Sequence, residues 1–239
     1  MSDIGAVTQT GAQPKWMWPL EAVAAALTLL ITVLLLSGVV SRYVFGLPLV
    51  WSEEVVSISF IWLTMLGAAI ALHRQEHLRL NLFVDMMPTR VRLWAGALAQ
   101  VLVATLLLTL LQPAIEYAQD EWFIKTPALD LPNTVRVGSI ALGLGLMLLM
   151  VVIQALKTSR WIDLLVAAVA VASLGWVAVQ LTDVWGQLGL FNIPVFLIAL
   201  VAVCLVLGVP IAFCFGLGAA CYLGFSTSVP LTVIIGRMD

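Results

Sequence analysis

Charged, polar and aromatic residues gather between residues 42 and 54, where two long apolar runs meet. Arg42 is followed by Trp51, Ser52, Glu53 and Glu54. If a helix begins there, the Ser52 hydroxyl can cap it, and the positive end of the helix dipole stabilises each carboxylate by about 0.3–1 kcal/mol. Alternatively, one carboxylate points inward and pairs with Arg42 or with a basic group on a partner helix. The sequence leaves open which acid does so.

Two histidines and three cysteines are the other residues whose chemistry could support a metal site or a nucleophile. His73 and His77 are four residues apart and would share one helix face, but without further ligands they supply at most half of a metal site. Cys204, Cys214 and Cys221 lie in one apolar stretch without CxxC spacing. Neither a GxSxG elbow nor an HExxH helix is present. We therefore expect no catalytic, metal or cofactor site in this chain, and no enzyme.

The composition indicates that these residues are held by membrane helices. The 239 residues are 62% hydrophobic and only 10% charged, whereas soluble domains carry about 25% charged residues. The formal net charge of −2 gives no basic surplus that could follow a phosphate backbone, so a nucleic acid is not an expected partner. A soluble fold is excluded because it could not bury this much apolar surface.

Several apolar runs are long enough to cross a bilayer, which takes about 20 helical residues. A segment of mixed polarity at residues 73–92 is expected to lie in the membrane interface. The last apolar stretch, residues 193–225, is too long for one crossing, and Gly208 and Pro210 predict a kink or a break within it. The predicted spans before that stretch are residues 20–40, 55–72, 93–115, 137–156 and 164–182.

The Lys and Arg residues in the short connections predict the orientation, because they gather on the cytoplasmic side. Alternate connections place eight on one side and three on the other, so the N-terminus is expected in the cytoplasm. The acidic segment 116–130 then lies outside, where it either meets an extracytoplasmic partner or is simply solvated. The eight are Lys15, Arg74, Arg79, Arg90, Arg92, Lys157, Arg160 and Arg237, and the three are Arg42, Lys125 and Arg136.

Polar groups within the first five predicted spans are sparse. A single-chain transporter would need polar groups at mid-membrane to hold a charged solute. Apart from serines and threonines, these spans offer little beyond Gln100, Gln112 and Gln154. The pattern favours a scaffold in a larger transporter over the alternative, a self-sufficient small channel or carrier.

Three motifs carry a resemblance to a known family: SRYVFGLPLVWSEE, FIWLTMLGAAIALHRQEHLRLNLFVDMMP and TPALDLPNTVRVGSIALGLGLMLL. Together they closely resemble the small (Q-type) membrane subunit of tripartite ATP-independent periplasmic (TRAP) transporters, over about residues 20–157. The later segment LIALVAVCLVLGVPIAFCFGLGAACYLGF looks like the start of the large (M-type) subunit, as in members that fuse the two. Because the chain stops at Asp239, we expect a fragment of a fused permease rather than a truncated gene product.

The resemblance implies an all-α polytopic protein of the bacterial inner membrane. Its expected parts are a four-helix small-subunit unit, a connector helix and the first large-subunit helix. The corresponding ranges are 1–14 for a flexible N-terminus, 15–160 for the small-subunit domain, 161–190 for the connector and 191–239 for the start of the large subunit.

The resemblance also implies a function and partners. The complete system would import an organic anion, such as a carboxylate or acidic sugar, on a sodium gradient, with the sodium ions bound in the large subunit. The implied partners are the large membrane subunit, a periplasmic solute-binding protein and membrane lipid. The residues carried over have expected roles in positioning and subunit packing, and they are Arg42, Trp51, Glu53, Glu54, Gly67 and His77, with Gly208 and Pro210 at the large-subunit start.

Overall fold

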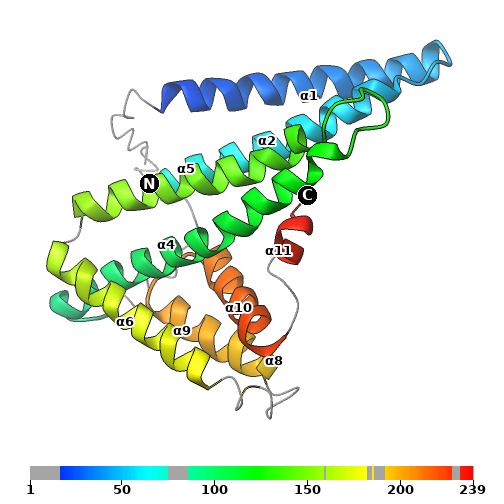
Figure 1. Cartoon of the computed structure of the whole chain (residues 1–239). Helices are drawn as coiled ribbons and strands as arrows, with labels where there is room; N and C mark the ends of the chain where they lie inside the picture. Colours follow the sequence, from blue (N-terminus) through cyan, green and yellow to red (C-terminus); the bar gives the residue numbers. More distant parts are fainter. Residues whose placement is uncertain are drawn as a thin grey trace, which may run out of the picture.

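The computed structural model describes residues 17–74, 86–158, 160–181, 185, 192–227 and 232–238, and this part of the chain is all-α without a β-strand. Five helices are long and apolar enough to cross a membrane, which confirms the predicted polytopic fold (Figure 1). Each of them contains most of one predicted apolar run. They are α1 (Trp18–Val44), α2 (Val50–His73), α4 (Thr89–Asp120), α5 (Thr134–Thr158) and α6 (Trp161–Gln180).

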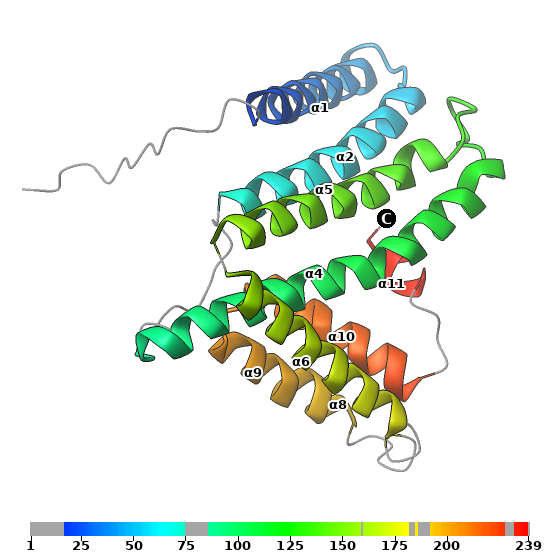
Figure 2. The ribbon, with the colours of Figure 1, turned by 60° about the vertical axis from the view of Figure 1, so that its left-hand side comes forward.

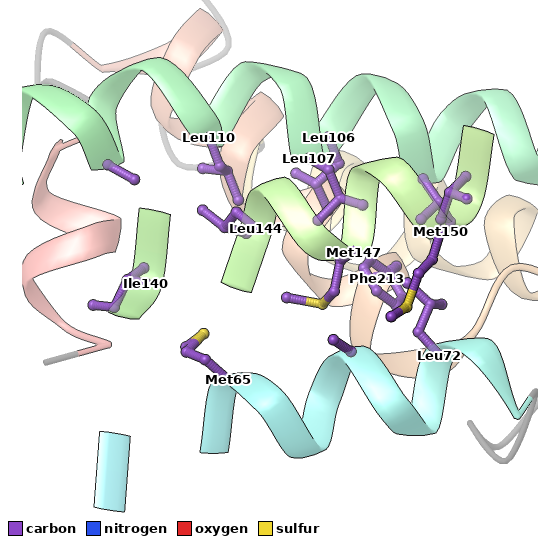
Figure 3. Close-up of a cluster of buried hydrophobic side chains, with 14 of the residues drawn as sticks. Met65, Leu72, Leu106, Leu107, Leu110, Ile140, Leu144, Met147, Met150 and Phe213 are labelled. Carbon is purple, nitrogen blue, oxygen red and sulfur yellow. The ribbon is translucent and has the colours of Figure 1, made fainter. Parts of the chain in front are cut away.

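Helix α4 is the centre of the bundle. In Figure 2, α1, α2 and α5 lie on one side of α4, and the C-terminal helices lie on the other. Buried apolar side chains from α2, α4 and α5 form one core with side chains from the C-terminal region (Figure 3). This core joins the two sides of α4 through apolar contact, and its labelled members are Met65, Leu72, Leu106, Leu107, Leu110, Ile140, Leu144, Met147, Met150 and Phe213.

The contact between α2 and α5 depends on a glycine. A Cβ built on Gly143 would lie 2.7 Å from the Cβ of Met65, closer than real Cβ atoms approach any neighbour. The absence of a side chain at Gly143 therefore sets the distance between the two helices. The indole N–H of Trp62 also donates to the backbone carbonyl of Val135 at 2.9 Å, which ties α2 to the first turn of α5.

The C-terminal region contains two short helices in place of one long span. The first runs continuously through α8 (Asn192–Pro194), the π-helical segment η3 (Val195–Leu200) and α9 (Val201–Val206), and the second is α10 (Ile211–Ser226). Between them the chain reverses, so that α10 packs back against η3 and α9 (Figures 1 and 2). The short helix α11 (Thr232–Gly236) follows.

The reversal occurs at the two residues that predicted a break. Gly208 takes a left-handed conformation with φ +80°, and the N–H of Val209 donates to the carbonyl of Cys204 at 3.0 Å, which ends α9. Pro210 then directly precedes α10. The two helices approach closely because a Cβ on Gly218 would lie 2.9 Å from the carbonyl oxygen of Phe196. The sequence had indicated a kink or a break; the structure shows a helical hairpin.

This hairpin corrects one assignment in the orientation count. Helix α11 packs against the last turns of α4, where a Cβ added at Gly236 would lie 3.8 Å from the Tyr117 ring. Arg237 therefore lies at the end of the bundle that carries the α4–α5 loop, opposite to its predicted side. The count of eight against three Lys and Arg residues becomes seven against four. The prediction failed because it assumed a single crossing where the chain turns back.

Candidate functional site

The described charges divide between the two ends of the bundle. One end holds the α1–α2 turn and the α4–α5 loop, which lie near each other in Figure 1. We call this the acidic end, after Glu53, Glu54, Glu116, Asp120, Glu121 and Asp130. The other end is where α1 and α4 begin and where α2 and α5 finish. We call it the basic end, after Arg74, Arg90, Arg92, Lys157 and Arg160.

At the acidic end, a tight turn joins α1 to α2. Gly46 takes the left-handed conformation with φ +67°, which a side chain would disfavour. Ser41 closes the turn twice: its carbonyl accepts from the N–H of Leu47 at 3.2 Å, and its hydroxyl donates to the Leu47 carbonyl at 2.6 Å. This closure fixes the direction in which α2 leaves α1, and so positions the acids that follow.

The two adjacent acids of α2 have different partners, and the acid that pairs with Arg42 is exposed and does not point inward as the alternative interpretation expected. Glu53 forms an ion pair with Arg42 across the turn, and both side chains are more than half exposed. Glu54 reaches the α4–α5 loop, where its Oε2 accepts from the backbone N–H groups of Ala128 at 2.8 Å and Leu129 at 3.1 Å. Such charge-assisted bonds are roughly twice as strong as neutral ones. Glu53 therefore links two helices, and Glu54 holds a loop.

The prediction that Ser52 caps the second helix is wrong. Helix α2 begins at Val50, three residues before the start that a Ser52 cap would give, and Leu49 at its N-cap makes no side-chain capping bond. Ser52 already lies in the first turn, where its hydroxyl donates to the carbonyl of Leu49 at 2.8 Å. The side chain is buried, and its oxygen faces Gly38 of α1. Its role is to allow α1 and α2 to pack together.

The loop that Glu54 holds has an internal framework of its own. Two hydrogen bonds join Thr126 to Leu131. The Thr126 N–H donates to the Leu131 carbonyl at 2.8 Å, and the Leu131 N–H donates to Thr126 Oγ1 at 3.1 Å. Asp130 sits in the turn with φ +59°, a conformation that Asp tolerates better than most residues. Glu54 binds at the outside of this turn, so it fixes a preformed loop against α2.

The base of the loop is fastened to both of its helices. Asn133 Nδ2 donates to Glu121 Oε2 at 2.6 Å, and the Thr134 hydroxyl donates to the carbonyl of Ala118 at 2.7 Å. These bonds join the end of α4, with η1 (Glu121–Phe123), to the start of α5.

Several large apolar side chains of the acidic end are strongly exposed, namely Tyr43, Phe45, Leu47, Trp122 and Phe123.

At the basic end, a second ion pair ties α1 to α2. Arg74 donates to Glu21 at 2.8 Å, and about a third of each side chain is exposed. Neither residue was among the predicted site residues. Glu21 lies in the first turn of α1, and a partner 53 positions away leaves no local signal in the sequence.

The structure locates most of the remaining predicted residues. Trp51 is half-exposed in the first turn of α2, and Gly208 and Pro210 form the tip of the hairpin. At Gly67 an added Cβ would meet no atom of the described residues within 4 Å, so no described helix makes a close contact there. A contact of Gly67 with another subunit stays a prediction. His77, and with it the pairing to His73, lies outside the described residues.

The buried polar residues of the described chain are few and small. They are Ser52, Ser59, Thr126, Ser139 and Asn192. Within the described ranges, no three His, Cys, Asp or Glu side chains come together in a group that could hold a metal ion.

The residues whose importance the sequence did not reveal are Gly143, Glu21 and Arg74. A glycine within an apolar run signals a close approach only weakly, because Gly67 and Gly143 look alike in sequence.

Comparison with known proteins agrees with this architecture. A family model described as "Tripartite ATP-independent periplasmic transporters, DctQ component" matches residues 31–160, which include α2, α4 and α5 and the second half of α1. That range covers the acidic end with its turn, its paired acids and its loop. More than half of the chain therefore matches one family.

Individual relatives carry related names. The isethionate TRAP transporter permease protein DctMQ of Oleidesulfovibrio alaskensis is 26% identical over 187 residues, 77% of this chain and 29% of that protein. The sialic acid TRAP transporter small permease protein SiaQ of Vibrio cholerae is 24% identical over 94 residues, 39% of this chain and 54% of that protein. The sialic acid TRAP transporter permease protein SiaT of Haemophilus influenzae is 36% identical over 70 residues, 29% of this chain and 11% of that protein.

The chain spans at most about half the length of these relatives. The DctMQ alignment is longer than the region that the family model matches, which is consistent with a small permease region continuing into a fused sequence. The family match, the polytopic helical fold and the TRAP permease relatives all agree, and the chain belongs to the DctQ component family of tripartite ATP-independent periplasmic transporters.

Proposed function

We propose that the chain is the scaffold part of a TRAP permease and does not itself form the solute path. The observation that carries this proposal is the apolar interior: the buried side chains of the described helices are almost all hydrophobic, and the described ion pairs lie at the two ends. A path for a charged solute needs polar groups at mid-membrane. The scaffold positions a large membrane subunit and acts without catalysis.

The transported solute is an organic anion, such as a carboxylate or an acidic sugar. Two of the relatives are named for sialic acid transport and one for isethionate transport, and all of these solutes are organic acids. Uptake is coupled to sodium ions bound in the large subunit. A periplasmic solute-binding protein delivers the anion to the complex.

The protein sits in the inner membrane with its N-terminus in the cytoplasm. The corrected count of seven Lys and Arg residues against four still favours this orientation. The acidic end then faces the periplasm and is the side that meets the solute-binding protein. Residues 161–190 connect the small-subunit region to residues 191–239, which begin the large subunit.

Copurification and reconstitution test this function. The tagged chain is purified from its native membrane in mild detergent, and bound proteins are identified by mass spectrometry. We expect a large multi-helix permease, in trans or as part of a longer polypeptide. The purified chain alone is then placed in vesicles with a sodium gradient and labelled sialic acid or isethionate, beside vesicles holding the complete complex. Uptake by the chain alone would overturn the proposal in favour of a small carrier.

A further inference from the structure

Four cationic side chains gather at the basic end, on three different helical segments. Arg90 and Arg92 lie in the first turn of α4, Lys157 lies in the last turn of α5, and Arg160 immediately precedes α6. All four side chains are exposed. The acids among the described residues at this end are Asp163, partly buried in the first turn of α6, and Glu21, which pairs with Arg74. Positive charge therefore dominates this surface.

The register of α4 and α5 places these residues at a similar height. Thr134 is hydrogen-bonded to Ala118, and the two helices run in opposite directions from that contact. With a rise of about 1.5 Å per residue in both helices, the end of α5 at Thr158 is level with about residue 94 of α4. Helix α6 starts from there, contacts α4 and crosses it (Figure 2). Lys157 and Arg160 thus lie at the level of the first turn of α4.

Exposed apolar side chains lie directly beside the four cations. Leu93 on α4 is 63% exposed, and Trp161 and Ile162 on α6 are 70% and 72% exposed. Further along α6, the apolar surface continues through Leu165 and Val169, also mostly exposed. A small soluble anion has no apolar part that could cover these exposed side chains. A molecule with an anionic head and a long apolar chain fits both parts of it.

We propose that the surface formed by Arg90, Arg92, Lys157 and Arg160 binds the phosphate headgroup of an anionic phospholipid, whose acyl chains lie along the exposed faces of α4 and α6. Basic residues next to the membrane attract anionic lipids, and each contributes about a fivefold preference. Trp161 sits at the height where indole rings favour the headgroup layer. The acidic end lacks this combination because its exposed aromatics lie among carboxylates.

The inference rests on the membrane fold and not on the transport function. The test uses the full chain in nanodiscs of phosphatidylcholine with a minor fraction of phosphatidylglycerol, and native mass spectrometry counts the lipids that remain bound after release. We expect phosphatidylglycerol to be retained on the order of tenfold or more above its fraction in the disc. Enrichment no greater than its fraction in the disc would overturn the proposal.

Substitutions locate the site. The combined variant Arg90→Gln, Arg92→Gln, Lys157→Gln and Arg160→Gln is expected to lose the enrichment, and each single change to lower it about fivefold. The control variant Lys125→Gln with Arg237→Gln removes two cations at the acidic end and is expected to keep it. Equal loss in both variants would show a general charge effect and overturn the site. If the Gln variant does not fold, Arg90→Lys with Arg92→Lys and Arg160→Lys must keep the enrichment within about twofold, because the charges remain.

Two further arms separate other occupants. Inorganic phosphate is titrated at constant ionic strength. The proposal fails, and the ligand is a soluble anion, if two results occur together: phosphate binds through the four cations, and the Gln variant keeps the lipid enrichment. Copurification of the large permease subunit is measured with the same variant. If that subunit is lost while lipid enrichment persists, the surface is a protein contact, which also overturns the lipid site.

Discussion

Helix α2 packs against α5 on one side and against α1 on the other, and different forces hold the two pairs together. The α2–α5 contact is dense, with Gly143 against Met65 and a shared buried core. Helix α1 buries none of its own residues, but ion pairs fasten it to α2 at both ends, Arg42 with Glu53 and Glu21 with Arg74. One contact depends on shape and the other on charges at its ends.

The difference shows which contacts determine how the helices of this fold associate in a membrane. In a membrane, lipid solvates apolar side chains as well as a neighbouring helix does, so helix pairs need close packing or polar contacts to associate. Helices α2, α4 and α5 form the packed unit that places the α4–α5 loop. Helix α1 keeps an apolar face of its own along its whole length, open to lipid or to another subunit.

The largest effect is expected from Gly143→Ala, which tests the packed contact. The added Cβ lies 2.7 Å from the Cβ of Met65, and neither atom can move without its backbone. Overpacking of this kind costs about 1–3 kcal/mol of the free energy of unfolding. The measurement is equilibrium unfolding of the purified chain in mixed micelles.

Gly67→Ala is the matched control for Gly143→Ala. An added Cβ at Gly67 meets no atom of the described residues within 4 Å, and alanine favours a helix over glycine by about 1 kcal/mol. We expect unchanged or slightly increased stability of the chain alone. If both alanine variants lose the same stability, the α2–α5 distance is not set by Gly143. Loss of the large subunit from Gly67→Ala in copurification would support the predicted subunit contact.

The helices could be predicted from the sequence because apolar length alone determines them. Each of the five long helices covers most of a predicted run, and the break near Gly208 and Pro210 followed from backbone preferences. The direction of the chain after the break could not be predicted. A kink and a hairpin satisfy the same local rules, and the choice depends on packing of Gly218 against Phe196, two residues far apart in the sequence.

The second-largest effect is expected from a substitution of Glu54, which joins α2 to the α4–α5 loop. Glu54→Gln removes the charge from two backbone hydrogen bonds, and a hydrogen bond to a charged group contributes about 1.5–3 kcal/mol. We expect the amides of Ala128 and Leu129 to exchange with deuterium roughly tenfold faster, since about 1.4 kcal/mol corresponds to that factor. Hydrogen exchange with mass spectrometry on the loop peptide measures this.

Glu53→Gln is the control for the loop, because Glu53 pairs with Arg42, whereas the N–H groups of residues 128 and 129 donate to Glu54. Its loop peptide is expected to exchange at the wild-type rate. Equal acceleration in both variants would mean that the acids act through general charge and not through the observed bonds.

The candidate site could be located from the sequence only in part. The concentration of Arg42, Glu53 and Glu54 at one boundary marked the right segment, because charges are rare in such a chain. The partner of Glu54 could not be inferred, since backbone N–H groups 74 and 75 positions away have no side-chain signature. The Ser52 cap was predicted three positions after the observed N-cap, Leu49, because helix starts read from a sequence are uncertain by about two to four positions.

A smaller effect is expected at the basic end of α1, where Glu21 pairs with Arg74. Each side chain is about one third exposed, so water screens the pair only partly. A double-mutant cycle with Glu21→Gln and Arg74→Gln is expected to give a coupling free energy of about 1 kcal/mol, the upper part of the range for surface pairs. A coupling indistinguishable from zero would leave α1 held at this end by apolar contact alone.

The smallest effect is expected from the Arg42–Glu53 pair at the acidic end. Both side chains are more than half exposed, so the same cycle with Arg42→Gln and Glu53→Gln is expected to give about 0.2–0.5 kcal/mol, falling further in 1 M salt. Unfolding of the isolated chain at low and high salt measures it. A coupling larger than that of Glu21 with Arg74 would mean that exposure does not rank the two pairs. In that case the acidic end would hold α1 more firmly than the basic end, and the turn at Gly46 would be its main anchor.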